Sequence, residues 1–183
     1  MLELRRQIFH LLLGILLVIL LNLNIINLRL LIGILAIGIV ISFLCKYFKI
    51  FGIQWFLDRF DRIDARGAGI IAYFIGVIIV LLFFRRDIAL ASILILAFGD
   101  SFCHLGRFGK VKNPLNEKKL IEGLIIGVIA ASIAGSFFVP FYIALSGSLI
   151  AMILESLDLK IKGRVLEDNI LVPLISAIVM SLV

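Results

Sequence analysis

The sequence has few of the residues that make up the surface of a soluble protein. Only 16% of its 183 residues are charged, whereas 63% are hydrophobic, and the mean hydropathy is +1.22. This composition excludes a water-soluble domain and is typical of membrane proteins, whose spans are apolar runs of about 20 residues. We therefore expect one integral-membrane domain over residues 1–183 with the lipid bilayer as its surroundings, and no nucleic acid as a partner.

Cysteine is also scarce, which excludes a disulfide framework. Cys45 ends an apolar run and Cys103 lies in a polar stretch. Reduced thiols in a reducing compartment are the simpler interpretation. The N-terminal run RRQIFHLLLGILLVILL is like a signal peptide, but no small-residue cleavage site follows it and further spans do. We expect it to be an uncleaved anchor.

Seven apolar segments follow one another along the chain. They lack the alternation of a membrane barrel, and backbone groups in lipid must be satisfied within the segment, so the segments are predicted to be helices. The predicted fold class is all-α, a polytopic membrane protein with about seven transmembrane helices. The segments are 8–26, 30–48, 68–84, 88–103, 120–139, 141–154 and 170–183.

The charges predict the orientation of these spans. If the N-terminus is cytoplasmic, 15 of the 18 basic residues and 11 of the 12 acidic residues fall on the cytoplasmic side. The basic exceptions are Arg29, Arg85 and Arg86, and the acidic exception is Asp87. This bias follows the positive-inside rule. We expect a multi-pass protein of the cell membrane whose polar site faces the cytoplasm.

The second cytoplasmic connection contains FGIQWFLDRFDRIDAR, residues 51–66. Its apolar residues recur at helical spacing, with charged residues on the other face. This pattern predicts an amphipathic helix in the membrane interface. A surface brace is the simpler role for it, and a lid over an active site is the alternative.

Four carboxylates are predicted to lie beneath the cytoplasmic headgroups. Residues 88–99 reach only about 18 Å as a helix, short of a hydrocarbon core of about 30 Å, so Asp100 lies within it. The segments next to Glu155 and Asp168 are also too short to cross the core, so these two carboxylates are expected at a similar depth. Glu122 is the third residue of the apolar segment 120–139. Charges at such a depth normally line a wet cavity, so we expect all four to share one. Alternatively, Asp168 or Asn169 caps the last helix and Glu155 is an ordinary helix-end charge.

The polar stretch over residues 104–120 carries five basic residues against one glutamate. Gly106 and Gly109 allow a ligand to approach the backbone. Asn116 is expected to cap the fifth apolar helix, which places Lys118 and Lys119 in its first turn and makes a site for a polyphosphate. Mg²⁺ would be its natural complement, with Asp100 as the best ligand. The spacing does not fit a Walker A loop, and two histidines make a zinc site a poor explanation.

Near the N-terminus, Glu3, Arg6, His10 and Gly14 fall on one helical face. A histidine at the top of a first span is more often a hydrogen-bonded packing residue than a base, although histidine is the commonest acid–base group. Both interpretations of His10 stay open.

Together these motifs resemble the CTP-dependent lipid-alcohol kinases, a family that includes dolichol kinase, phytol kinase and the CTP-using diacylglycerol kinase. The resemblance covers most of the chain. An opening E-x-x-R motif, a GD…GR-x-G-K…KK-x-x-EG motif and a terminal DN-x-x-x-P motif carry it. The matching residues are Glu3, Arg5, Arg6, His10, Gly14, Gly99, Asp100, Gly106, Arg107, Gly109, Lys110, Lys118, Lys119, Glu122, Gly123, Asp168, Asn169 and Pro173.

The resemblance implies a membrane kinase that transfers the γ-phosphate of CTP to a lipid alcohol, with a polyprenol such as dolichol as the expected acceptor and Mg²⁺ as cofactor. The catalytic residues it implies are Asp100, Asp168, Glu122 and His10. The nucleotide-binding residues are Gly99, Gly106, Arg107, Gly109, Lys110, Lys118, Lys119 and Arg6. The metal ligands are Asp100, Asp168, Asn169 and Glu155.

Two other functions compete with this one. A CTP:lipid-phosphate cytidylyltransferase, which makes a CDP-activated lipid, would need the same triphosphate site. A transporter or structural membrane protein would instead spread its acidic residues over both halves of the membrane. The sequence does not indicate an oligomeric state.

Overall fold

The structure of the chain is a computed structural model that describes residues 2–48, 52, 67–105, 111–113, 116–157, 160–161, 164–165 and 167–183. The interfacial helix predicted from residues 51–66 therefore falls, apart from residue 52, outside the described residues, and it stays a prediction.

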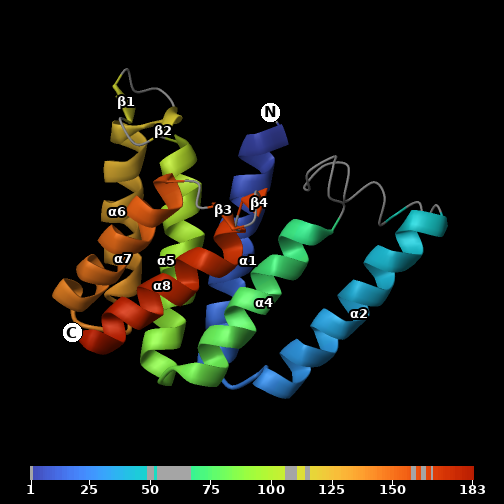
Figure 1. Cartoon of the computed structure of the whole chain (residues 1–183). Helices are drawn as coiled ribbons and strands as arrows, with labels where there is room; N and C mark the ends of the chain where they lie inside the picture. Colours follow the sequence, from blue (N-terminus) through green and yellow to red (C-terminus); the bar gives the residue numbers. More distant parts are fainter. Residues whose placement is uncertain are drawn as a thin grey trace.

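Seven helices make up most of the described part of the chain, and each corresponds to one predicted apolar segment (Figure 1). Three of them, α1, α2 and α5, are long and apolar enough to cross a membrane. The other four are apolar but only 15 or 16 residues long. The predicted helical class is confirmed, and seven complete spans remain a prediction. The helices are α1 (Leu2–Asn22), α2 (Leu28–Tyr47), α4 (Ala68–Phe83), α5 (Arg86–Leu105), α6 (Ile121–Gly135), α7 (Phe141–Ser156) and α8 (Asp168–Leu182).

Turn and cap residues set the limits of these helices. The turn after α1 includes Asn24, whose left-handed φ of 57° is tolerated by asparagine better than by most residues. Asn27 then caps α2, because its side-chain oxygen accepts the N–H of Leu30 at 3.0 Å. Between α6 and α7 the chain turns at Pro140, the N-cap residue of α7. The predicted boundary between segments 120–139 and 141–154 is confirmed.

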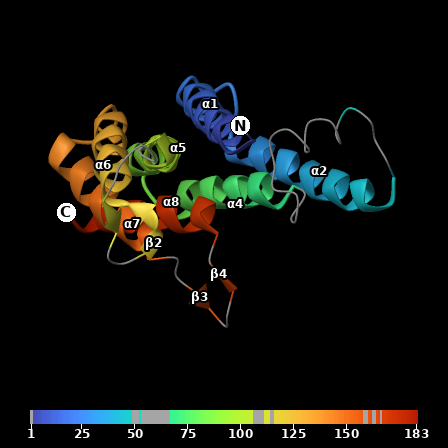
Figure 2. The same cartoon turned by 90° about the horizontal axis from the view of Figure 1, so that it is seen from above.

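Helix α5 is the centre of the bundle. It packs against α1, α4, α6, α7 and α8 (Figures 1 and 2). Ala89, Ala91, Ile93 and Ile95 on it are fully buried. Because five helices surround α5, 72% of its apolar window is buried, against 6% for α2.

Small residues let α5 approach its neighbours closely. A Cβ built on Gly127 of α6 would lie 2.9 Å from the carbonyl oxygen of Gly99 in α5. One turn further along, α6 is joined to α7 by the buried hydroxyls of Ser132 and Ser148, 2.6 Å apart. Small and hydroxyl-bearing residues at helix contacts are typical of membrane bundles.

Helix α2 lies at the edge of the bundle. It packs mainly on α4 and extends away from the other helices (Figure 2). Only 6% of its apolar window is buried, and Ile32, Ile37 and Phe43 are among its exposed side chains. In a membrane protein such an apolar outer face is the one that contacts lipid.

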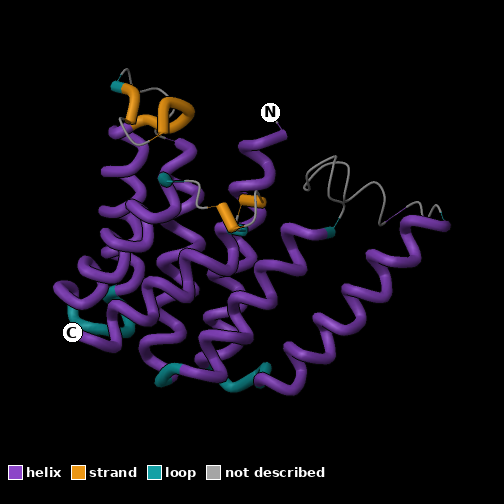
Figure 3. The backbone as a smooth tube through the Cα atoms, viewed as in Figure 1, coloured by secondary structure: helices purple, strands orange, loops and turns teal. Residues whose placement is uncertain are grey.

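Two short hairpins occur in the polar connections (Figure 3). Strand β1 (Lys112–Asn113) pairs antiparallel with β2 (Asn116–Leu120) between α5 and α6. Strand β3 (Lys160–Ile161) pairs with β4 (Arg164–Val165) between α7 and α8. The ends of the helices that carry these connections lie on the side of the bundle where α1 begins (Figure 1).

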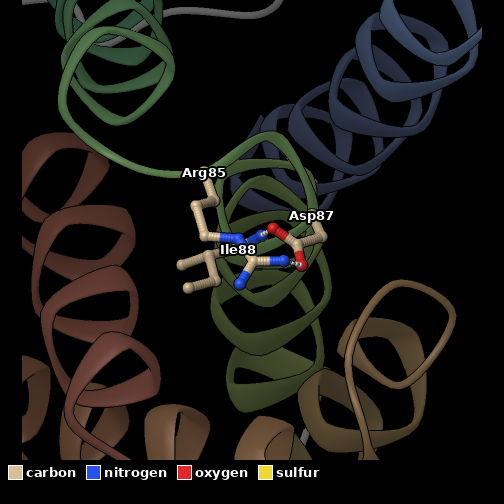
Figure 4. A network of polar contacts seen from close by, with 3 residues as sticks. All are labelled: Arg85, Asp87 and Ile88. Carbon is tan, nitrogen blue, oxygen red and sulfur yellow. Dashed lines mark hydrogen bonds and ion pairs between the residues drawn. The ribbon is translucent and has the colours of Figure 1, made fainter.

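The opposite end of the bundle is held by charged residues at the start of α5. Asp87 accepts the N–H of Ile88 and the guanidinium of Arg85, each at 3.0 Å (Figure 4). Arg86 donates to the carbonyls of Leu21 and Asn22 at the end of α1, where the last carbonyls of a helix lack the usual i+4 donor. A cavity of about 590 Å³ lies beside Arg85 and Asp87. These charges therefore have structural partners at the end away from the hairpins.

Candidate active site

Asp100 lies in the second-to-last turn of the central helix α5. Its carboxylate oxygen Oδ1 is 3.4 Å from Nε2 of His104, one turn further along the same helix. The two side chains are only 13% and 23% exposed. Asp100 and His104 therefore lie on one face of α5.

Helix α1 brings two further polar groups to Asp100. Arg6 and His10 both interact electrostatically with its carboxylate, and His10 is buried. The hydroxyl of Ser101 donates to the backbone carbonyl of Gln7 at 3.0 Å, which joins α5 to α1 at this level. Arg6 and His10 thus lie on one face of α1, as their spacing predicted.

Tyr73 of α4 completes this group. Its ring packs edge-on against the imidazole of His10, with the ring centroids 5.4 Å apart, and it is fully buried. Sequence reasoning missed Tyr73, although it has the only side chain in AGIIAYFIGVIIVLLF that can form hydrogen bonds. We call Arg6, His10, Tyr73, Asp100 and His104 the Asp100 cluster.

Glu122 contacts the backbone of the connection before it. Its Oε1 accepts the N–H of Val111 at 3.1 Å, while the carbonyl of Val111 accepts the N–H of Ile121 at 3.1 Å. This pair of bonds fixes the start of α6 to the residue that precedes β1. In the structure, the Glu122 side chain therefore binds the backbone N–H of Val111. Its predicted catalytic role is untested.

Glu155 and Asp168 lie at the ends of α7 and α8 on the same side of the bundle. Glu155 is buried in the last turn of α7, and Asp168 is the first residue of α8. The next residue, Asn169, donates from its side chain to the carbonyl of Gly69 in α4 at 3.1 Å. Asn169 thus joins α8 to α4, and its predicted role as a metal ligand stays a prediction.

The backbone of Asn169 makes a second contact with α4. Pro173, four residues later, has no N–H to donate to the carbonyl of Asn169. A Cβ on Gly76 of α4 would collide with this carbonyl oxygen. The DN-x-x-x-P motif and a glycine of the third apolar segment therefore form one contact between helices.

The basic stretch is placed only in part. Gly106, Arg107, Gly109 and Lys110 lie outside the described residues. The prediction that Asn116 caps the next helix, with Lys118 and Lys119 in its first turn, is wrong. Residues Asn116–Leu120 form β2, because their backbone pairs with β1, and α6 begins only at Ile121.

Gly99 has a packing role that the sequence did not reveal. A Cβ at this position would lie 2.6 Å from the sulfur of Met152 in α7 and 3.5 Å from Ala131 in α6. The absence of a side chain therefore lets α5 pack closely against α6 and α7 at this point. A role of Gly99 in nucleotide binding stays a prediction.

The described residues do not form a ready metal cage. No group of three His, Cys, Asp or Glu side chains among them is close enough to hold an ion. Mg²⁺ at phosphoryl-transfer sites, however, is usually held by one or two carboxylates together with phosphate oxygens and water. Asp100, a shielded carboxylate, fits a site of that kind.

The fold and this polar end define an apolar helical membrane protein that gathers ionisable groups from several helices at one end of its bundle. Comparison with known proteins adds two relatives. The chain is 31% identical over 184 residues to the uncharacterized protein MJ1137 of Methanocaldococcus jannaschii, covering 98% of this chain and 93% of that protein. At this identity and coverage, the chain belongs to the family of that archaeal protein.

The second relative has a named activity. The chain is 26% identical over 140 residues to CTP-dependent diacylglycerol kinase 1 of Eremothecium gossypii, covering 61% of this chain and 43% of the kinase. This distant similarity supports the CTP-dependent lipid kinase family without selecting a member. No model of a known protein family matches the chain, and no solved structure matches it.

Proposed function

We propose that the protein is a membrane kinase that transfers the γ-phosphate of CTP to a lipid alcohol, with a polyprenol such as dolichol as the acceptor. The observation that carries the proposal is the Asp100 cluster. It places a carboxylate, a guanidinium and two imidazoles at one end of an apolar bundle, and the basic motif follows α5 in the sequence. The distant similarity to a CTP-dependent diacylglycerol kinase supports both the nucleotide and the class of acceptor.

The chemistry requires charge neutralisation more than covalent help from the protein. Phosphoryl transfer depends mainly on positioning the reactants and stabilising charge on the phosphoryl oxygens. Arg6 would contact the triphosphate from α1, and the predicted basic residues Arg107, Lys110, Lys118 and Lys119 would contact it from the connection before α6. Asp100 would hold Mg²⁺, with Asp168, Asn169 or Glu155 as further predicted ligands, and the ion would neutralise phosphate charge.

The reaction can be written so that its bonds balance. The acceptor oxygen forms a bond to the γ-phosphorus, and the bond from that phosphorus to the β–γ bridging oxygen breaks. CDP leaves with the electron pair. The hydroxyl proton passes to a base of the Asp100 cluster, for which Asp100 and His10 are the candidates. An acceptor held within the membrane would reach the cluster from the side, and CTP would reach it from the cytoplasm.

The test is transfer of label by the purified protein in lipid nanodiscs. The protein is incubated with Mg²⁺ and with CTP labelled on the γ-phosphate or, separately, on the α-phosphate. The acceptors are farnesol, a longer polyprenol and diacylglycerol, which the named relative uses. We expect γ-label in a chloroform-soluble product and α-label in water-soluble CDP.

Each other outcome has a defined meaning. With lipid phosphates as acceptors, α-label in the lipid and release of pyrophosphate would identify a cytidylyltransferase. If γ-label enters diacylglycerol and no prenol, the kinase activity stands and the polyprenol acceptor is wrong. If label enters no lipid with any acceptor, the proposed function is refuted.

A further inference from the structure

The hydroxyl of Tyr73 is the deepest polar group of the Asp100 cluster. Tyr73 is fully buried, and its hydroxyl oxygen has no hydrogen-bond partner among the residues that the structure describes. Leaving a buried hydroxyl unsatisfied costs free energy, whereas phenylalanine would fill the same space without that cost. The phenol O–H can therefore donate one hydrogen bond that no described residue accepts.

The hydroxyl is directed at α1 and α5 on the membrane side of Asp100. A Cβ placed on Gly14 would overlap both the tyrosine oxygen and the Cβ of Ala97. Ala97 precedes Asp100 by three residues, about 4.5 Å along α5, and Gly14 follows His10 by four residues, about 6 Å along α1. The phenol oxygen thus lies about one helical turn deeper than the charged groups.

We propose that Tyr73 binds the hydroxyl group of the lipid acceptor, an inference that rests on the proposed kinase function. The phenol O–H donates to the acceptor oxygen, which orients this oxygen toward the γ-phosphorus while its proton faces Asp100 and His10. Tyr73 is then a substrate-contacting residue that sets the depth of the alcohol in the membrane.

The location favours a lipid alcohol over the triphosphate. A neutral phenol in an apolar layer is a good partner for a neutral hydroxyl, but it supplies no charge to offset a polyphosphate. Arg6 lies at the outer level with Asp100, where its guanidinium would neutralise phosphate charge. The cluster therefore has a charged outer level, which would bind the nucleotide, and a neutral deeper level at Tyr73, which would bind the alcohol.

The experiment compares Tyr73→Phe with wild type in nanodiscs and varies farnesol and CTP separately. Loss of one neutral hydrogen bond should lower kcat/KM for farnesol by roughly 3- to 10-fold, and KM for CTP should stay within about twofold. The melting temperature should be equal to or above that of wild type, because the variant removes an unsatisfied buried oxygen. Tyr142→Phe, which alters an exposed tyrosine of α7, is the matched control and should behave as wild type.

A second measurement separates this inference from the proposed function. Farnesol alone, without CTP, should raise the melting temperature of wild type and of Tyr142→Phe, and should raise that of Tyr73→Phe less. If wild type transfers phosphate and Tyr73→Phe keeps the wild-type kcat/KM for farnesol, the role of Tyr73 is refuted while the kinase function stands. If wild type transfers no phosphate, the proposed function fails. If farnesol raises the melting temperature of all three proteins equally, or of none of them, the role of Tyr73 is refuted as well.

Discussion

The ring of His10 on α1 packs edge-on against the ring of Tyr73 on α4, with an angle of 76° between the ring planes. The two residues lie 63 positions apart in the sequence, and the central helix α5 brings them together beside Asp100. Because the contact joins helices that are separated along the chain, the Asp100 cluster exists only when the bundle is packed. Changes that disturb this packing should therefore affect the site even where they remove no polar group.

Gly14 offers the most direct test of that packing. In Gly14→Ala the new methyl group would overlap the hydroxyl of Tyr73 and the Cβ of Ala97. Overpacking of this kind costs about 1–3 kcal/mol, and it should displace Tyr73 from His10. We expect a lower melting temperature and a loss of transfer activity, measured on the protein in nanodiscs.

Gly38→Ala is the matched control for this change. Gly38 lies on the peripheral helix α2, and a Cβ there meets no atom within 4 Å. Alanine is favoured over glycine inside a helix by about 0.5–1 kcal/mol, so this variant should be at least as stable as wild type and fully active. Equal behaviour of the two glycine variants would show that the contact between Gly14 and Tyr73 is wrongly assigned.

Asp100 is expected to be indispensable for transfer. Asp100→Asn keeps the size of the side chain but removes the charge that faces Arg6, His10 and His104. If the carboxylate helps to hold Mg²⁺ and CTP, kcat should fall by roughly 100-fold or more, a loss typical of a group that stabilises the transition state electrostatically. The measurement is the initial rate of γ-label transfer at saturating CTP.

The matched control is Asp87→Asn at the opposite end of the same helix. The substituted amide would keep an oxygen that accepts the N–H of Ile88, and the exposed ion pair that Asp87 forms with Arg85 contributes little to stability. Activity should remain within about twofold of wild type. A similar loss in both variants would mean that Asp100 acts through the stability of α5 and not through the reaction.

Much of the fold could be predicted because lipid constrains it strongly. Each described helix corresponds to one apolar run, since a run of apolar residues in a membrane must satisfy its own backbone. The turn at Pro140 and the cap at Asn27 follow from local chemistry that is visible in the sequence. The central place of α5 was not visible, because seven segments of similar apolar composition do not show which of them packs against the others.

The sequence predicted several ionisable residues of the site. It did not predict Tyr73 or the place of the lysines before α6. Arg6 and His10 share a face with the spacing expected of a helix, and a charge at the depth of Asp100 is rare enough to indicate a site. Tyr73 was missed because its partners come from two other helices, α1 and α5, which the sequence does not place beside α4. Lys118 and Lys119 were misplaced because the pairing of β2 with β1 and the bonds to Val111 override a local helix cap.

The contact between Glu122 and Val111 leads to a prediction about backbone mobility. Glu122→Ala removes the acceptor of the Val111 N–H, so hydrogen exchange in a peptide containing residue 111 should become faster. If this contact positions the preceding basic motif for CTP, KM for CTP should rise roughly 3- to 10-fold, as expected when the loss of a supporting hydrogen bond weakens binding by about 1 kcal/mol. Glu122→Gln keeps an acceptor oxygen and should show a smaller change in both measurements.

Two results would contradict this role of Glu122. Unchanged exchange at residue 111 in the alanine variant would mean that the contact does not protect the backbone. Faster exchange with an unchanged KM for CTP would mean that the contact is structural and has no part in nucleotide binding. The glutamine variant distinguishes loss of the hydrogen bond from loss of the negative charge.

The orientation of the chain decides whether the Asp100 cluster can meet CTP at all. Most basic residues lie on the side predicted to be cytoplasmic, and Asn24 and Glu167 are exposed residues on opposite predicted sides. In a background with Cys45→Ser and Cys103→Ser, Asn24→Cys should react with a membrane-impermeant maleimide in intact cells. Glu167→Cys should react only after the membrane is permeabilised, because the positive-inside rule places it within the cytoplasm. The reverse pattern would put the basic connections and the Asp100 cluster outside the cell, where no CTP is supplied, and would therefore refute the orientation and the proposed donor together.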